Sequence, residues 1–98
     1  MRSISFKDTR PIVCVQGLGF VGMAMAIAVA DAKDENGNPF YNVIGVDLSN
    51  ETGFAKISSI NNGVLPLTTN DEELQAAFDR VITQGNLKAT SDSNVYEL

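Results

Sequence analysis

The sequence predicts an α/β fold with a parallel sheet, and three observations predict it. A short apolar run at residues 11–16 leads into a glycine-rich loop, and a helix-compatible stretch at 23–32 follows at once. A second run at 41–47 is rich in β-branched residues, as buried parallel strands are. Strands that alternate with helical segments favour parallel pairing through crossover connections.

The loop between the first strand and the first helix carries the pattern Gly-x-Gly-x-x-Gly. Gly17 allows a sharp turn off the strand, and Gly19 allows the backbone to approach a pyrophosphate without a Cβ in the way. Gly22 allows the helix to pack close to the strand, and the helix N-terminus offers N–H groups to phosphates. In this order the pattern is the dinucleotide-binding fingerprint of a Rossmann fold.

A secretory signal peptide is a rival interpretation of the same residues. The stretch 11–30 carries no charge, follows three basic residues and ends in Ala-Val-Ala, which resembles a cleavage site. Gln16 and the three glycines interrupt the apolar run, and they weaken a transmembrane helix as well. The dinucleotide interpretation is favoured because it also predicts a second strand that ends in an acidic residue, and one follows.

Asp47 ends that second strand. In a Rossmann unit a carboxylate here accepts hydrogen bonds from the adenosine ribose hydroxyls and repels a 2′-phosphate. Its interval from the glycines is longer than about 20 residues, and a turn-rich insertion at 34–39 accounts for the excess. The alternative roles for Asp47 are a helix N-cap or a solvated turn residue.

The remaining residues continue the α/β alternation. A helix is predicted over 52–60, capped by Ser49 or Asn50, with an apolar side of Phe54, Ile57 and Ile60. Asn61 to Gly63 ends it.

A third helix follows, capped by Thr68, Thr69 or Asn70, with acidic residues 71–73 in its first turn. Its apolar stripe consists of Leu74, Ala77, Phe78, Val81 and Ile82. Gly85 ends it, residues 87–90 form a short third strand, and residues 94–98 begin a further helix.

Composition narrows the class of function. The 98 residues make one domain at most, and 44% hydrophobic residues supply a modest core. A net charge of −5 without histidine argues against nucleic acid or an anionic membrane as a partner. One cysteine and no histidine exclude a zinc cluster and a disulfide framework. Cys14, inside the first strand, is expected to be a buried, inert thiol, and residues 71–73 to be helix N-terminal charge rather than a metal site.

Four segments together resemble the nucleotide-sugar 6-dehydrogenases, the UDP-glucose and GDP-mannose dehydrogenase family. They are Val-Gln-Gly-Leu-Gly-Phe-Val-Gly at 15–22, Val-Ile-Gly-Val-Asp at 43–47, Ile-Asn-Asn-Gly-Val-Leu-Pro at 60–66 and Gly-Asn-Leu-Lys-Ala-Thr at 85–90. The resemblance covers roughly residues 12–92, and the ordered run of motifs is far more specific than the glycines alone. It implies the N-terminal NAD-binding domain of an enzyme of the cytoplasm and of polysaccharide biosynthesis.

By position, the resemblance assigns the NAD pyrophosphate to Gly17, Leu18, Gly19, Phe20, Val21 and Gly22. It assigns the ribose to Asp47, with Lys56 nearby if residues 51–54 are a local insertion; the alternative for Lys56 is a solvated helix face. The family's Glu-Pro-Gly-Leu is replaced by Leu-Thr-Thr-Asn-Asp-Glu-Glu-Leu at 67–74, so no role is carried over to that segment.

The resemblance also implies what lies outside these residues. The family oxidises a sugar C6 hydroxyl to a carboxylate in two NAD-linked steps, with a catalytic cysteine beyond the point that matches Leu98. Residues 1–98 are therefore expected to be the N-terminal part of the dinucleotide-binding domain, without catalytic or sugar-binding domains and inactive alone. The nucleotide sugar would bind through those missing domains.

An incomplete sheet has a consequence for association. The first strand is central in the Rossmann strand order, so without a fourth strand it becomes an exposed apolar edge. Self-association through this strand, or a homo-oligomer, is expected. The alternatives are another NAD-dependent dehydrogenase of the hydroxyacid or 6-phosphogluconate type, a stand-alone NAD-binding or regulatory module, and a small exported protein.

Overall fold

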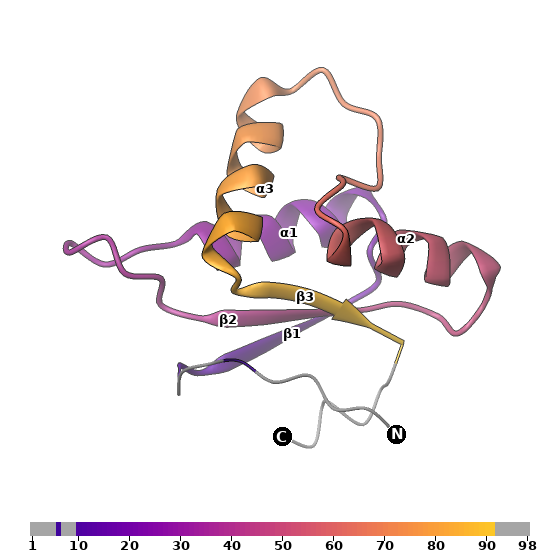
Figure 1. Cartoon of the computed structure of the whole chain (residues 1–98), viewed down its shortest axis with the longest axis horizontal. Coiled ribbons are helices and arrows are strands. Elements are labelled where there is room, and N and C mark those ends of the chain that lie inside the picture. Colours follow the sequence, from indigo (N-terminus) through magenta and orange to yellow (C-terminus); the bar gives the residue numbers. More distant parts are fainter. Residues whose placement is uncertain (1–5, 7–9, 92–98) are drawn as a thin grey trace.

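The computed structural model describes residue 6 and residues 10–91. The chain runs β1 (Ile12–Gln16), α1 (Phe20–Asp31), β2 (Asn42–Val46), α2 (Glu51–Asn61), α3 (Glu72–Gln84) and β3 (Leu87–Thr90) (Figure 1). This element order confirms the predicted α/β class. The helix predicted from residue 94 lies outside the described residues.

The sheet is parallel, with strand order β1-β2-β3. Val13 pairs with Val43, which pairs with Leu87, and the same register continues to the carboxyl ends. No strand of the described chain lies beyond β1, so the prediction that β1 forms an edge is confirmed. All three strands end on one side of the molecule, where parallel sheets of this type bind ligands.

The other edge, at β3, is closed by a side chain. Asn61, the last residue of α2, donates from Nδ2 to the Ala89 carbonyl at 2.9 Å and accepts from the Ala89 N–H at Oδ1, at 3.0 Å. The amide thus pairs with β3 as a neighbouring strand would, which blunts that edge. The two edges of the sheet therefore differ: at β3 the Asn61 amide pairs with the strand backbone, whereas β1 is the edge strand on the other side.

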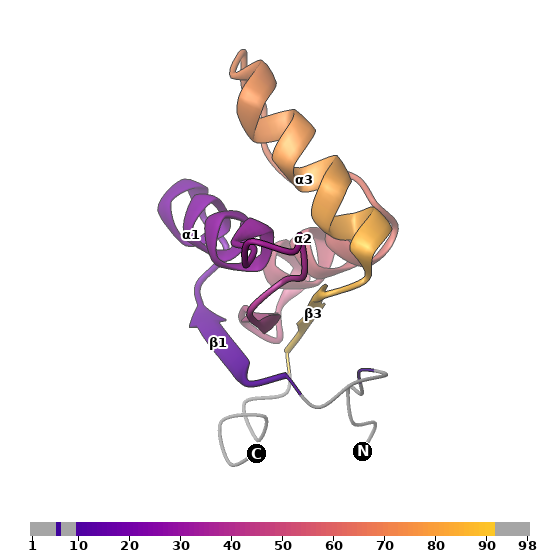
Figure 2. The ribbon, with the colours of Figure 1, turned by 90° about the vertical axis from the view of Figure 1, so that its left-hand side faces the viewer.

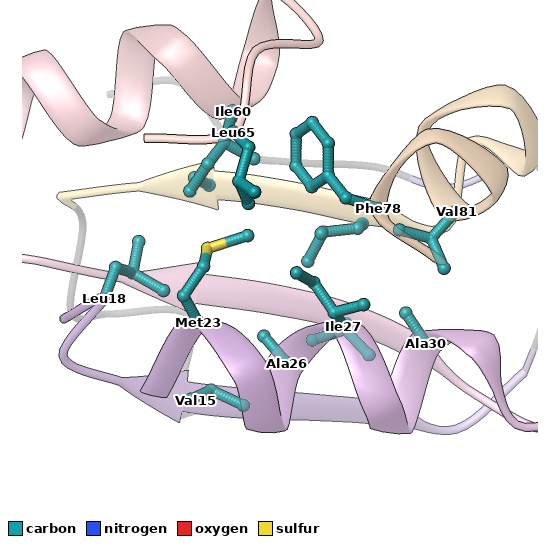
Figure 3. Close-up of a cluster of buried hydrophobic side chains, with 13 residues drawn as sticks. Val15, Leu18, Met23, Ala26, Ile27, Ala30, Ile60, Leu65, Phe78 and Val81 are labelled. Carbon is teal, nitrogen blue, oxygen red and sulfur yellow. The ribbon is translucent and has the colours of Figure 1, made fainter. Parts of the chain in front are cut away.

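All three helices cover the same face of the sheet (Figures 1 and 2). Parallel strands joined by right-handed crossovers in the order 1-2-3 place their helices on one side. Four residues of α1 at helical spacing, Met23, Ala26, Ile27 and Ala30, point into the core and meet Phe78 and Val81 of α3 (Figure 3). This core fixes α1 across the sheet and with it the glycine loop.

The opposite face of the sheet is formed by the alternate residues of each strand. Ile44 and Val46 are buried there, with Phe6 and Cys14 packed against them. Cys14 is only partly buried, so the expected burial is incomplete: its strand lies at the edge of the sheet, and the helices of the described residues all cover the other face. Burial still raises the pKa of the Cys14 thiol above its ordinary value of 9.0, which keeps it protonated and weakly nucleophilic at neutral pH.

Two expectations about helix ends need correction. The first helix begins at Phe20 rather than at residue 23, because the chain becomes helical directly after Gly19. The third helix is capped by Asp71, whose side chain accepts from the N–H groups of Glu73 and Leu74. Thr69 instead accepts from the Asp71 N–H at 3.0 Å, so the hydroxyl orders the residue that forms the cap.

The other expected helix ends fit the structure, but one residue expected on the apolar side of α2 does not. Asn50 caps α2, as one of the two expected residues. Gly85 ends α3 in the left-handed conformation at φ +80°. Phe54 was expected on the apolar side of α2, but its side chain is 51% exposed, whereas Ile60 is buried.

The insertion at 34–39 forms a turn held largely by its own hydrogen bonds, with one more from Arg10 Nε to the Pro39 carbonyl. The Asp34 carboxylate accepts the N–H groups of Asn36 and Asn38, at 2.8 and 3.0 Å. The turn therefore lengthens the connection to β2 without changing the sheet. Across the described residues, no helix has the length and apolar character needed to span a membrane.

Candidate functional site

The first part of the site is the corner between β1 and α1. Gly17 turns the chain at φ +86°, in the region that favours glycine. Its N–H donates to the Val46 carbonyl at 2.7 Å, which ties the loop to the carboxyl end of β2. The turn directs α1 back across the sheet and leaves the loop at the end of the strands.

Gly22 lies in the first turn of α1, against that loop. A Cβ at this position would stand 1.8 Å from the Gly17 carbonyl oxygen, far inside van der Waals contact. The close packing of helix and strand that was predicted for Gly22 is therefore present. Any side chain here would force the helix away from the loop.

Gly19 differs from its two neighbours because it faces open space. A Cβ built on Gly19 would have no atom of the protein within 4 Å, and its φ of −69° is open to any residue. As the N-cap of α1 it makes no side-chain hydrogen bond to the helix. The first N–H groups of α1 thus have no side-chain cap and border a space that a phosphate group can enter.

The second part of the site is Asp47, directly after β2. Its Oδ2 accepts from the Leu18 N–H at 2.8 Å, and its Oδ1 accepts from the Leu48 N–H at 2.7 Å. The carboxylate therefore joins the glycine loop to the β2–α2 turn across 29 residues of sequence. It does not cap α2, whose N-cap is Asn50.

The surroundings of Asp47 keep it ionised. Burial alone would raise the pKa of this carboxyl, but the N–H groups of Leu48 and Leu18, and the positive charge of Lys56, outweigh burial and hold it below its ordinary value of 3.8. At neutral pH the side chain is an acceptor with full negative charge. That charge suits hydroxyl donors and opposes a phosphate.

Lys56 reaches the same place from α2. Its Nζ lies 3.9 Å from Asp47 Oδ2, and its side chain is 30% exposed. Lys56 therefore lies beside Asp47, although this weak ion pair alone contributes little to stability.

These groups line one pocket at the carboxyl end of the sheet, with a volume of about 480 Å³. It is lined by Gln16, Gly17, Leu18, Gly19, Val46, Asp47, Leu48, Ser49, Lys56 and Ser91. Five of these residues were not predicted as site residues: Gln16, Val46, Leu48, Ser49 and Ser91. They end β1 and β2 or follow the ends of β2 and β3, so the rule that ligands bind beyond the carboxyl ends of parallel strands would have found them.

Three predicted residues lie differently from the rest. The Leu18 side chain is buried over Gly45, so only its backbone faces the pocket. Phe20 and Val21 are 61% and 74% exposed and line a neighbouring apolar groove between β1 and α1.

The described residues contain no cluster of side chains that could bind a metal ion. No three cysteine, aspartate or glutamate side chains among residues 6 and 10–91 converge on one point. Asp71 instead serves as the cap of α3.

Comparison with known proteins places this arrangement in a family. Residues 12–97 match the model of the UDP-glucose/GDP-mannose dehydrogenase family, NAD binding domain. A comparison with curated proteins found no significant match.

Several solved structures share the fold. The chain is similar to NDP-N-acetyl-D-galactosaminuronic acid dehydrogenase from Methanosarcina mazei, with 28% identity and a TM-score of 0.71 over 85% of this chain and 16% of that one. It is similar to GDP-mannose dehydrogenase from Pseudomonas aeruginosa, with 32% identity and a TM-score of 0.60 over 83% and 15%. UDP-D-ManNAc dehydrogenase from Pyrococcus horikoshii gives 30% identity and a TM-score of 0.59 over 83% and 16%.

The chain thus spans less than a fifth of the length of these relatives. Within that span it has the partial Rossmann sheet, the glycine loop and the acidic end of β2. The protein belongs to the UDP-glucose/GDP-mannose dehydrogenase family, and residues 12–97 match the NAD-binding domain of that family.

Proposed function

We propose that the pocket at the carboxyl end of the sheet holds the ADP half of NAD. The backbone of Gly17, Leu18, Gly19, Phe20, Val21 and Gly22 would bind the pyrophosphate, and Asp47 with Lys56 would bind the adenosine ribose. One observation carries this assignment: Asp47 Oδ2 lies 2.8 Å from the Leu18 nitrogen, so the acidic end of β2 directly adjoins the glycine loop.

The groups present fit the two parts of the ligand. The space over Gly19 and the uncapped start of α1 suit a pyrophosphate, which accepts hydrogen bonds and carries negative charge. Asp47 already accepts two N–H groups, and a carboxylate offers about four acceptor positions. Two positions remain for two vicinal hydroxyls.

The same corner favours NAD over NADP. A 2′-phosphate would replace one of these hydroxyls and bring its negative charge close to that of Asp47. Lys56 offers only partial relief, because its charge is already turned toward Asp47 at 3.9 Å.

We infer that the full enzyme oxidises the C6 hydroxyl of a nucleotide sugar to a carboxylate. Two NAD molecules in turn would each accept one hydride, and water would supply the second carboxylate oxygen; the residues described above would bind and orient the cofactor. The dehydrogenases that share this fold support the substrate class. The catalytic and sugar-binding groups would lie outside residues 1–98, so this segment alone would be inactive, and the enzyme would act in the cytoplasm in polysaccharide biosynthesis.

Calorimetric titration of the 98-residue chain with NAD and NADP tests the binding assignment. We expect NAD to bind more tightly, and Asp47→Ala to weaken NAD binding about tenfold to a hundredfold, as loss of hydrogen bonds to a charged group does. Asp79→Ala, on the exposed side of α3, is the matched control and leaves affinity unchanged. Equal affinities for NAD and NADP, or no effect of Asp47→Ala, would refute the ribose assignment.

We also propose that the chain self-associates through β1. The edge is flanked by an apolar groove lined from β1 and α1, while the β3 edge is closed by Asn61. Light scattering should show a species larger than a monomer, and Ile12→Lys, which puts a charge on this 41% exposed edge residue, should shift it toward monomer. A monodisperse monomer of high thermal stability would contradict this.

A further inference from the structure

We propose that Gly53 is a positioning residue for the ribose corner, because only glycine lets α2 pack against the Leu48 carbonyl and bring Lys56 to Asp47. The inference rests on the proposed function, since it concerns the same corner of the NAD site. Gly53 lies in the segment 51–54, which has to be a local insertion if Lys56 is to match the family's basic residue, and to which the resemblance assigns no role.

The turn between β2 and α2 folds back onto the first turn of the helix. A Cβ at Gly53 would stand 2.0 Å from the Leu48 carbonyl oxygen and 2.9 Å from its carbonyl carbon. Both are backbone atoms, so no side-chain rotation can relieve the overlap. Gly53 is accordingly buried, although it lies within three residues of the helix start.

Hydrogen bonds hold the same turn from its other side. Asn50 Oδ1 accepts from the Gly53 N–H at 2.8 Å, and the Asn50 carbonyl accepts from the Phe54 N–H at 2.8 Å. Leu48 in turn donates its N–H to Asp47. A shift of α2 relative to this turn would therefore be transmitted directly to Asp47.

Lys56 follows Gly53 by one helical turn and lies on the same side of α2. Its ammonium stands 3.9 Å from Asp47 Oδ2, at the outer limit of an ion pair. An outward movement of α2 by an ångström or more would separate the two charges. It would leave the Leu48 N–H and the Asp47 carboxylate less well aligned for the ribose.

Gly53→Ala is the test, read by calorimetric titration of the 98-residue chain with NAD. We expect about a tenfold loss of NAD affinity, the size of one hydrogen bond to a charged group. In a Lys56→Met background the same substitution should cost clearly less, because part of its effect acts through Lys56. Ser58→Ala, on the exposed side of α2, is the matched control and changes nothing.

A second readout does not depend on NAD. Titration of the Asp47 carboxyl by ¹³C NMR should show its pKa rising toward the ordinary value in Gly53→Ala, as Lys56 and the Leu48 N–H withdraw. If Gly53→Ala does not fold, Asn50→Ala weakens the same corner more mildly and should raise the Asp47 pKa in the same direction.

The outcomes separate the two proposals. No NAD binding by the unsubstituted chain would refute the proposed function, whatever the variants do. Normal NAD binding with an equal loss in both backgrounds and an unmoved Asp47 pKa would mean that Gly53 serves only the packing of α2, and the positioning role would fall.

Discussion

The two strand-to-helix corners of this protein are built alike in one respect and oppositely in another. In each, a glycine in the first turn of the helix packs on a carbonyl of the preceding turn: Gly22 on Gly17, and Gly53 on Leu48. The β2–α2 corner caps its own helix with Asn50 and carries the charge of Asp47. The β1–α1 corner has neither a side-chain cap nor a charge.

The difference explains how one pocket can bind two unlike groups. A helix start that lacks its own cap keeps N–H groups for a ligand, and an anion suits them. A helix start that is already capped offers fewer N–H groups to an anion, and the nearby carboxylate suits hydroxyls instead. Close packing by glycine sets the geometry of both corners, while the presence or absence of a cap sets their chemistry.

The largest effect is expected where close packing is broken at the first corner. Gly22→Ala should destabilise the fold by about 1–3 kcal/mol, as overpacking does, instead of gaining the stability that alanine normally brings to a helix. Denaturant unfolding measures this. Ala28→Gly, on the exposed side of α1, calibrates the helix propensity and should cost about 1 kcal/mol. A stabilised Gly22→Ala would show that α1 does not need its close approach to the loop.

The next effect separates packing from ligand space. Gly19→Ala should leave stability within about 0.5 kcal/mol, because its Cβ meets no protein atom. NAD affinity should nevertheless fall by about tenfold or more, since the new methyl group occupies the space assigned to the pyrophosphate. Paired calorimetry and unfolding measure both quantities. An unchanged NAD affinity would refute the assignment of the pyrophosphate to this corner.

The smallest effect concerns acid stability, which only the charged corner should feel. The pKa of Asp47 is depressed in the folded state, so its contribution to stability is present above the ordinary value of 3.8 and is lost as the pH falls through the lower folded value. Unfolding midpoints measured from pH 7 to pH 3 should fall more for the unsubstituted protein than for Asp47→Asn.

A second acidic residue, Asp31, also contributes to stability in this pH range, and its effect has to be separated from that of Asp47. The Arg80 guanidinium, bonded to Asp31 at 2.8 and 3.1 Å, lowers the pKa of Asp31 and joins α1 to α3. Asp31→Asn is therefore the comparison variant, and the Asp47 effect should persist in its background. Parallel pH curves for the unsubstituted protein and Asp47→Asn would show that the carboxylate does not stabilise the corner.

Much of the fold was predictable because local signals agreed with one another. The apolar runs, the glycine loop and the helix-end signals together located all three strands. The third strand was predicted at 87–90, and β3 occupies those residues. One error arose where neighbouring residues compete for one role. Thr69 and Asp71 both suit a helix cap, and only the backbone path decides that Asp71 serves while Thr69 supports it.

The sequence by itself determined the order of strands and helices along the chain, the parallel pairing of the strands, and the choice of the glycines and Asp47 as candidate binding residues. It could do so because periodicity and turn chemistry are local properties of the chain. Tertiary structure alone decided which distant groups meet. It brought Asp47 to the Leu18 N–H, Lys56 to Asp47, Asn61 to the open edge of β3 and Gly53 to the Leu48 carbonyl. Those contacts depend on how far each helix sits from the sheet, and packing in the shared core sets that distance.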